Sequence, residues 1–290
     1  MSDALKFFRT KKFSVSPFLK GTRIYHMEED ESLHDHILFT YQDRIGTTNG
    51  TKAKVVAWAS NSSSTIEGFT QLSAQQLVFV ESKKHCLYLF DRQSKNISAF
   101  AGECEEGLRP LYSPTSLHRD IVNNSQVFII NLVGKIFTVN LDTQSIELFV
   151  ENNNIYTNAH MTQNDKGDVY FTSRNALYRV GYINRHVELL SGYGGDCDAY
   201  LDGSLNRALY SNPSGLLFIT PDILLIADRG NNKLRLVDLK SNRVSTLDVC
   251  LGCKEIKRPY TLLLLKGSLY IGHYCQGISV FKGEFVDSEH

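Results

Sequence analysis

The stretch "ADRGNNKLRLVDL", residues 227–239, decides the fold, because it joins two apolar strand-like runs through a short polar turn. Glycine and asparagine tolerate the left-handed backbone of tight hairpin turns, so Gly230 and Asn231 predict a turn with positive φ. Asp228 and Arg235 flank this turn, close enough in an antiparallel hairpin for a charge-assisted ion pair. We predict that the turn and the pair are architectural and hold this hairpin together.

The same pattern of strand, tight turn, strand, polar turn and strand recurs along the chain. Five such units are visible, each preceded by a shorter strand-like segment, and they start at Leu77, Val127, Val169, Leu224 and Leu269. Spacings of about 40 to 55 residues are typical of propeller blades with four antiparallel strands. A less regular sixth unit fits residues 36–59, with its inner strand upstream.

The last unit ends after its third strand, so the ring needs a strand from elsewhere. The segment 13–21 can supply it, which would remove the exposed edges of the sheets. We therefore predict an all-β fold, a six-bladed β-propeller of four-stranded antiparallel blades that forms one domain over residues 1–290. Residues 1–35 would hold the closing strand and the inner strand of the first blade, and the clearest blades span 66–282. Five or seven blades remain alternatives, because the first unit is weakly marked.

Residues 192–247 resemble the NHL-repeat β-propeller family. They contain, in the family's order, a Gly-rich loop, Asp202-Gly203, the tetrapeptide "NPSG" at 212–215 and the hairpin quoted above. Residues 80–104 are similar to the cysteine-bearing repeat of animal extracellular proteins, although Glu81 and Tyr88 replace the usual Asp and Arg. The resemblance implies a propeller but no single activity, since relatives include RNA-binding modules, protein-interaction domains and a metal-dependent amidating lyase.

Composition is that of a globular protein, with 42% hydrophobic and 21% charged residues among 290 and a formal net charge of zero. A neutral chain lacks the overall positive field that dominates affinity for nucleic acids. No apolar run is long enough to span a membrane. The N-terminus lacks the apolar core of a secretory signal, which is compatible with an intracellular protein or with a mature secreted chain.

The cysteines suggest an oxidised protein. Because blade strands alternate in direction, the connections between blades and the turns between second and third strands share one face, here called the top face. All six cysteines map to this face: Cys86, Cys104, Cys197, Cys250, Cys253 and Cys275. The hairpin places Cys86 within disulfide reach of Cys104, and Cys250 or Cys253 beside Cys275, which leaves Cys197 to the remaining partner. An even count favours an extracellular protein with disulfides. As an alternative, "CLGC" at 250–253 is half of a zinc site or a redox motif, although no partner motif is nearby.

Four glycosylation sequons agree with secretion, at Asn49, Asn61, Asn96 and Asn123. Chance supplies about three such triplets in a chain of this composition, so their number decides nothing. All four fall in predicted turns or connections, where a glycan would be tolerated.

The inner strand of each blade lines the central channel, and its start opens at the top face. Residues at these starts are the candidates for binding or chemistry: Glu67, Thr115, Asn158, His160, Asn212 and Tyr260. Glu67, Asn158 and Asn212 resemble the set that holds a central calcium ion in six-bladed hydrolases of the lactonase and phosphotriesterase kind. Calcium takes six to eight oxygen ligands, for which one carboxylate and two amides are a thin set. We therefore predict no resident cofactor, with a central calcium ion as the alternative.

Other sites fail on spacing or charge. His118, His160 and His273 lie on different blades and do not form the zinc site of the amidating lyase. The acidic loop at 196–202 lacks the glycine and glutamate of an EF-hand. The basic cluster of Lys6, Arg9, Lys11 and Lys12 indicates a solvated arm. Acidic residues gather in the top-face loops, which is the wrong sign for phosphate: Glu103, Glu105, Glu106, Asp196 and Asp198.

Taken together, the sequence predicts a secreted or cell-surface recognition module. It would bind a protein or glycan partner through its disulfide-tied top face, without catalysis and without nucleic acid. A calcium-dependent hydrolase at the top of the channel is the first alternative. An intracellular RNA-binding propeller is the second.

Overall fold

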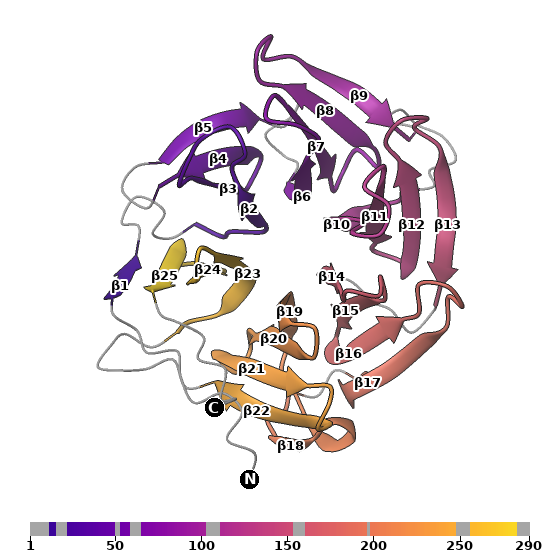
Figure 1. The fold of residues 1–290 in the computed structure, drawn as a ribbon, viewed down its shortest axis with the longest axis vertical. Coiled ribbons are helices and arrows are strands. Elements are labelled where there is room, and N and C mark those ends of the chain that lie inside the picture. Colours follow the sequence, from indigo (N-terminus) through magenta and orange to yellow (C-terminus); the bar gives the residue numbers. More distant parts are fainter. Residues whose placement is uncertain are drawn as a thin grey trace.

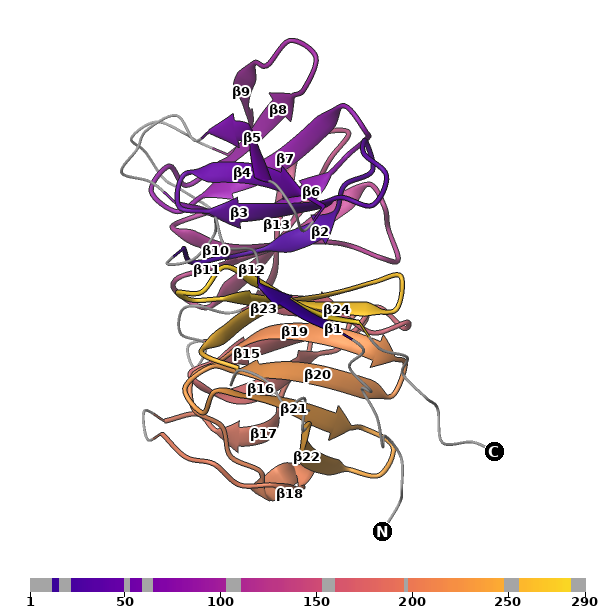
Figure 2. The ribbon, with the colours of Figure 1, turned by 90° about the vertical axis from the view of Figure 1, so that its left-hand side faces the viewer.

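The computed structural model describes residues 12–15, 22–49, 53–58, 65–102, 111–152, 160–195, 198–247 and 256–282. Six antiparallel sheets follow one another around a central axis, so the predicted six-bladed β-propeller is confirmed (Figure 1). Five and seven blades are thereby excluded. Figure 2 shows the same ring from its edge.

Each of the first three blades has four strands, in sequence order from the centre outward. Blade 1 consists of β2 (Met27–Glu29), β3 (Ile37–Tyr41), β4 (Arg44–Thr48) and β5 (Ala53–Trp58). Blade 2 consists of β6 (Ile66–Gln71), β7 (Gln76–Glu81), β8 (Leu87–Asp91) and β9 (Ile97–Ala101). Blade 3 consists of β10 (Pro114–Arg119), β11 (Gln126–Asn131), β12 (Lys135–Asn140) and β13 (Ile146–Glu151).

The remaining three blades follow the same plan with two departures. Blade 4 consists of β14 (Met161–Gln163), β15 (Val169–Ser173), β16 (Asn175–Val180) and β17 (Val187–Tyr193). Blade 5 consists of β19 (Pro213–Thr220), β20 (Ile223–Asp228), β21 (Lys233–Asp238) and β22 (Arg243–Leu247), with a fifth strand outside them. Blade 6 combines β23 (Pro259–Leu265), β24 (Ser268–His273) and β25 (Ile278–Lys282) with β1 (Lys12–Val15).

The N-terminal strand closes the ring, as predicted. β1 pairs antiparallel with β25, in a register that runs from Lys12 opposite Lys282 to Val15 opposite Ser279. The two strands come from opposite ends of the chain and lie side by side (Figure 1). This pairing covers the edge of β25, which would otherwise present unpaired backbone groups to solvent or to another chain.

Blade 5 has the four predicted strands and, outside them, a short fifth strand that the sequence pattern did not indicate. The extra strand β18 (Gly203–Ser204) pairs with β22 and leads into a short 3-10 helix, η2 (Leu205–Arg207). The reason is the long connection between blades 4 and 5, which folds back along the outer edge of blade 5 before entering the inner strand.

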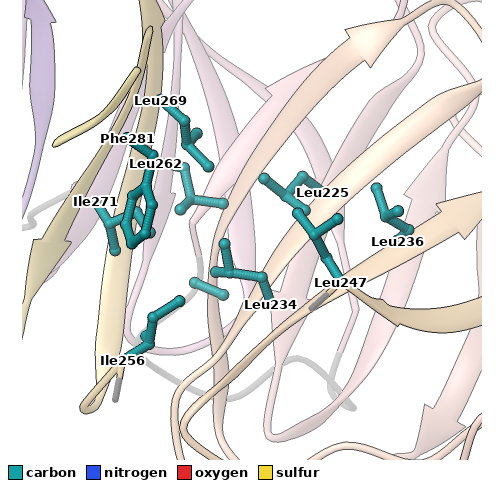
Figure 3. Packing of buried hydrophobic residues seen from close by; sticks show 10 residues of the cluster. Leu225, Leu234, Leu236, Leu247, Ile256, Leu262, Leu269, Ile271 and Phe281 are labelled. Carbon is teal, nitrogen blue, oxygen red and sulfur yellow. The ribbon is translucent and has the colours of Figure 1, made fainter. Parts of the chain in front are cut away.

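The core is a ring of apolar clusters, one at each junction between neighbouring blades. At the junction of blades 5 and 6 the labelled residues of Figure 3 pack across the gap: Leu225, Leu234, Leu236 and Leu247 on one side, and Ile256, Leu262, Leu269, Ile271 and Phe281 on the other. Burial of each such side chain contributes about 1.5–3 kcal/mol. The core therefore lies between the blades, in six clusters around the ring.

Candidate functional site at the channel mouth

The hairpin of residues 227–239 forms the predicted ion pair. Arg235 and Asp228 are both fully buried, with Nη1 of Arg235 2.8 Å from Oδ2 of Asp228. Arg235 also donates to the backbone oxygens of Leu201 and Leu209, each at 2.8 Å, and Nη2 lies 2.6 Å from Oδ1 of Asp202. A charge in this position needs all these partners, because burial without them costs several kcal/mol. The network therefore ties the connection between blades 4 and 5 to its blade.

The turn of this hairpin differs from the prediction in its backbone. The residue with positive φ is Asn232, at 55°, and not Gly230 or Asn231. Gly230 is needed for space, because a Cβ there would lie 2.0 Å from Oγ of Ser211. Asn231 donates from Nδ2 to Oδ2 of Asp228 at 2.9 Å, so it supports the ion pair instead of shaping the turn.

Three of the predicted channel residues, Glu67, Thr115 and Tyr260, occupy equivalent places in their blades. Each is skipped where the ladder of the inner strand shifts register, between Ile66 and Gly68, Pro114 and Ser116, and Pro259 and Thr261. A bulge re-aims the side chain of the extra residue. In blades 2, 3 and 6 the start of the inner strand therefore turns one side chain out of the ladder.

Tyr260 is the centre of an aromatic group at the channel mouth. Its ring makes edge contacts with Tyr25 and His160, at centroid distances of 5.9 and 4.8 Å, and lies 5.9 Å from the ring of Tyr274. Burial raises the pKa of Tyr260, which keeps the phenol neutral. Burial lowers the pKa of His160 to about 3, so this imidazole is also neutral at physiological pH.

Glu67 acts electrostatically on this aromatic group. Burial raises the pKa of Glu67 to about 7, against a hydrogen bond from Thr65 and the positive charge of Arg23. Its charge in turn contributes to the raised pKa of both Tyr25 and Tyr260. This carboxyl group therefore titrates close to neutral pH.

Three arginines that the sequence did not single out surround Tyr274. The guanidinium carbons of Arg23, Arg258 and Arg229 lie 3.3, 4.2 and 5.3 Å from its ring centroid. The pKa of Arg229 is lowered, mainly because the side chain is buried. Tyr260 acts in the opposite direction, and the positive charges of Arg258 and Arg23 lower the pKa further. Within the described residues, none of the three arginines forms an ion pair with a carboxylate.

These residues define what we call the mouth cluster: Arg23, Tyr25, Arg229, Arg258, Tyr260 and Tyr274. They come from the segment before β2, the turn between β20 and β21, the start of β23 and the turn between β24 and β25. Tyr25 and Tyr260 are buried and form its base, whereas Tyr274, Arg23 and Arg229 are half-buried and Arg258 is exposed. The cluster is thus a positively charged rim on an aromatic base.

Asn212 lies beside the mouth cluster, where it contacts Arg229, and does not fit a calcium site. Its Oδ1 accepts a hydrogen bond from Nη2 of Arg229 at 3.3 Å, and its Nδ2 donates to Oδ1 of Asp198 at 3.1 Å. An oxygen that faces a guanidinium is a poor ligand for a cation, because the two positive charges repel. Asn158, the other predicted amide ligand, lies outside the described residues. We therefore derive no chemistry through calcium.

The other predicted polar residues do not join the cluster. The hydroxyl of Thr115 donates to the backbone oxygen of Ile130, at 3.4 Å, within its own blade. His273 bonds Ser279 and the backbone oxygen of Lys257, and burial lowers the pKa of His118 to about 4. Nowhere in the described ranges do three His, Cys, Asp or Glu side chains gather in a way that would hold a metal ion.

The structure describes only two of the six cysteines, Cys86 and Cys275. The other four lie outside the described residues: Cys104, Cys197, Cys250 and Cys253. Cys86 is buried and disulfide-bonded, with its partner beyond those residues. Cys275 is an exposed free thiol in the turn after β24, so the disulfide expected there is not formed in this structure.

The predicted sequons and the predicted acidic charge of the top face are described only in part. Asn49, Asn96 and Asn123 are exposed, while Asn61 lies outside the described residues. The expected acidic character of the top face does not describe the mouth, where three arginines gather. The acidic residues at 103–106 and 196 lie outside the described residues, and Asp198 is engaged by Oγ of Ser211 at 2.7 Å.

The arginines were missed although their sequence positions carry a signal. Arg229 directly follows Asp228 in the opening stretch, and Arg258 directly precedes Pro259 at the start of an inner strand. Both positions open onto the top face in any propeller of this topology. A search for charged residues next to the repeat's fixed positions would have found them.

Comparison with known proteins gives the fold and no more. No protein-family model and no curated protein sequence matches the chain. Among solved structures, an auxiliary nutrient binding protein from Bacteroides ovatus is similar with a TM-score of 0.73 and 14% identity, over 97% of this chain and 75% of that one. Virginiamycin B lyase from Staphylococcus aureus is similar with a TM-score of 0.62 and 12% identity, over 93% and 99%. A chain of the nidogen/laminin complex gives 0.60 and 14% identity, over 81% and 84%.

These neighbours are β-propellers with different roles, so the likeness leaves the function open. No helix in the described part of the chain is long and apolar enough to cross a membrane.

Proposed function

We propose that this protein is a secreted or cell-surface propeller of the NHL type that binds a protein or glycan partner at its channel mouth, without catalysis. The mouth cluster carries this proposal. Tyrosine and arginine dominate the energetics of recognition surfaces, where they form central anchors. Here strands and tight turns hold them in place, so little conformational entropy is lost when a partner binds.

The extracellular part of the proposal is supported by Cys86. A Cβ built on Gly102 would lie 3.3 Å from Cα of Cys86, so the chain two residues before Cys104 already contacts it. A disulfide between Cys86 and Cys104 fits this approach. Mass spectrometry of protein secreted from animal cells should find this linked pair and glycans on exposed sequons such as Asn96. Free thiols throughout and unmodified asparagines would contradict an extracellular location.

A binding screen tests the recognition role. Wild-type protein is used to select ligands from a displayed library of secreted proteins and from a glycan array. Selected ligands should then lose about tenfold or more in affinity for Tyr274→Ala, which corresponds to at least about 1.4 kcal/mol. Ile183→Ala is the matched control, since Ile183 is 94% exposed in the turn between β16 and β17, away from the mouth. Ligands that ignore Tyr274→Ala but need Ile183 would contradict a mouth site.

Glu67 favours a second candidate, hydrolysis at the channel mouth. A carboxyl group with a pKa of about 7 in a channel has the property of a general acid or base. Glu67→Gln separates the two functions, because a hydrolase would lose turnover while a recognition module would keep its affinity. Turnover of lactone or phosphotriester substrates by the wild type, abolished in Glu67→Gln, would favour the enzyme.

A further inference from the structure

We propose that the mouth cluster binds carboxylates, and that its ligand is an acidic segment of a partner protein. This inference rests on the proposed recognition function and names the chemistry of its ligand. It is carried by the convergence of Arg23, Arg229 and Arg258 on Tyr274.

The first step concerns charge. Three guanidinium groups lie within 5.3 Å of one ring, and no described carboxylate forms an ion pair with any of them. Two acids lie near the cluster: Asp198 is hydrogen-bonded to Ser211 and Asn212, and the buried Glu67 acts on Arg23 electrostatically without forming an ion pair. Like charges gathered in a partly buried place repel, and an incoming anion removes this cost. Among the described residues, positive charge therefore exceeds negative charge at this site.

The second step concerns rigidity. The backbone nitrogen of Arg258 donates to Oδ1 of Asn232 at 2.7 Å, and its oxygen accepts from the nitrogen of Tyr274 at 3.0 Å. Next to Arg23, the nitrogen of Ile24 donates to the oxygen of His273 at 3.1 Å. Blades 1, 5 and 6 are thus joined at the mouth, and the backbone beside Arg23 and at Arg258 is fixed before any ligand arrives.

The third step concerns the source of the carboxylates. Stacked guanidinium groups cover the ring of Tyr274, so this ring is not free to stack against a sugar. Their planar N–H forks remain available and match carboxylates two bonds at a time. Three forks can take more than one carboxylate, which an acidic peptide supplies on adjacent residues, whereas an acidic glycan such as hyaluronan carries one carboxylate per disaccharide. The observations therefore favour an acidic protein segment over an acidic glycan.

The test uses fluorescein-labelled hexaglutamate as the probe, with hexaglutamine and hyaluronan oligosaccharide as comparisons, on the full chain. We expect hexaglutamate to bind the wild type, more weakly as salt rises, and hexaglutamine not to bind. The triple variant R23Q/R229Q/R258Q should lose about tenfold or more in affinity. A triple R23K/R229K/R258K variant, which keeps the charge but loses the forks, should fall in between.

The control is R207Q/K240Q/R243Q, which changes the net charge equally at exposed positions of blade 5 remote from the mouth. It should bind hexaglutamate as the wild type does, and circular dichroism should show that all variants are folded. Equal loss in both triple variants, or no binding to the wild type, would overturn the inference. Hyaluronan that binds as tightly, with the same dependence on the arginines, would overturn the choice of a protein ligand. If selected ligands still depend on Tyr274 while hexaglutamate does not bind, only this inference fails; if they do not depend on it, the proposed function fails too.

Discussion

Blades 5 and 6 place chemically different pairs at equivalent positions, the last residue of the second strand and the residue that reaches it from the third. Blade 5 has the ion pair of Asp228 and Arg235, at 2.8 Å. Blade 6 has a hydrogen bond between Nε2 of His273 and Oγ of Ser279, at 2.6 Å. Both pairs are buried.

The two pairs share a second contact, and this shows what the position requires. Arg235 donates to the backbone oxygens of Leu201 and Leu209, in the connection that leads into blade 5. Nδ1 of His273 bonds the backbone oxygen of Lys257, in the connection that leads into blade 6. In each blade a buried polar pair ties the end of a strand to the connection beside it, whether the pair is charged or neutral.

The blades also differ in how they are completed. Blade 5 takes its strands from one continuous stretch of the chain, whereas blade 6 needs β1 from the other end. Removing residues 1–15 should therefore open the ring at blade 6. We expect a loss of about 5 kcal/mol, because four residues of ladder disappear and the edge of β25 becomes exposed. Urea unfolding and size-exclusion chromatography would measure it. A deletion of residues 1–11, which keeps β1, is the control, and equal stability of the two would contradict ring closure by β1.

Breaking the ion pair of blade 5 should have the next largest effect. Arg235→Met leaves Asp228 buried without its cation and should cost about 4 kcal/mol of unfolding free energy. Arg179→Met is the matched control, because the pair of Arg179 and Glu188 is solvent-exposed and should be worth less than about 1 kcal/mol. Similar thermal shifts in both variants would show that burial does not set the strength of the pair.

Lowering the pH should destabilise the protein through the neutral pair of blade 6. Burial lowers the pKa of His273, so folding favours its neutral form. The stabilisation is complete above the unfolded pKa of about 6.5 and is lost as pH falls below it, at up to about 1.4 kcal/mol per pH unit. The unfolding free energy of His273→Asn should fall less steeply between pH 6.5 and 5 (about one proton fewer) than that of the wild type. Parallel curves would mean that His273 does not take up the proton.

The smallest effect should come from the hydroxyl of the same pair. Ser279→Ala removes one neutral hydrogen bond and should cost about 1 kcal/mol. Denaturant titration would measure this loss. A cost as large as that of Arg235→Met would remove the distinction between the charged and the neutral pair.

The sequence predicts the ring well, because the hairpin pattern repeats and an unpaired last strand demands a partner. It predicts less where a feature depends on neighbouring segments. The turn of blade 5 takes its positive φ at Asn232, and Gly230 is needed because it approaches Ser211 closely, a contact that no local pattern encodes. The fifth strand of blade 5 is too short to leave a strand signal. In blade 6 the neutral pair of His273 and Ser279 stands where blade 5 has Asp228 and Arg235, and no Asp and Arg in the sequence mark this position.

The arginines of the mouth cluster could be placed on the top face from the sequence, but their convergence on one ring could not. Arg23, Arg229 and Arg258 come from three blades, and only the curvature of the ring brings them to Tyr274. Glu67, Thr115 and Tyr260 were predictable as a set, because each starts an inner strand. Of these three, only Tyr260 belongs to the mouth cluster, because membership depends on side-chain contacts that the repeat pattern does not contain.

Partner binding at the mouth can be measured most directly at Cys275. This thiol is exposed and free, and it follows Tyr274 of the mouth cluster. Its alkylation rate, read by peptide mass spectrometry, should fall about tenfold or more when a protein ligand selected with the wild type is present at saturation. An unchanged alkylation rate with ligand bound would place the partner elsewhere on the ring and contradict recognition at the channel mouth.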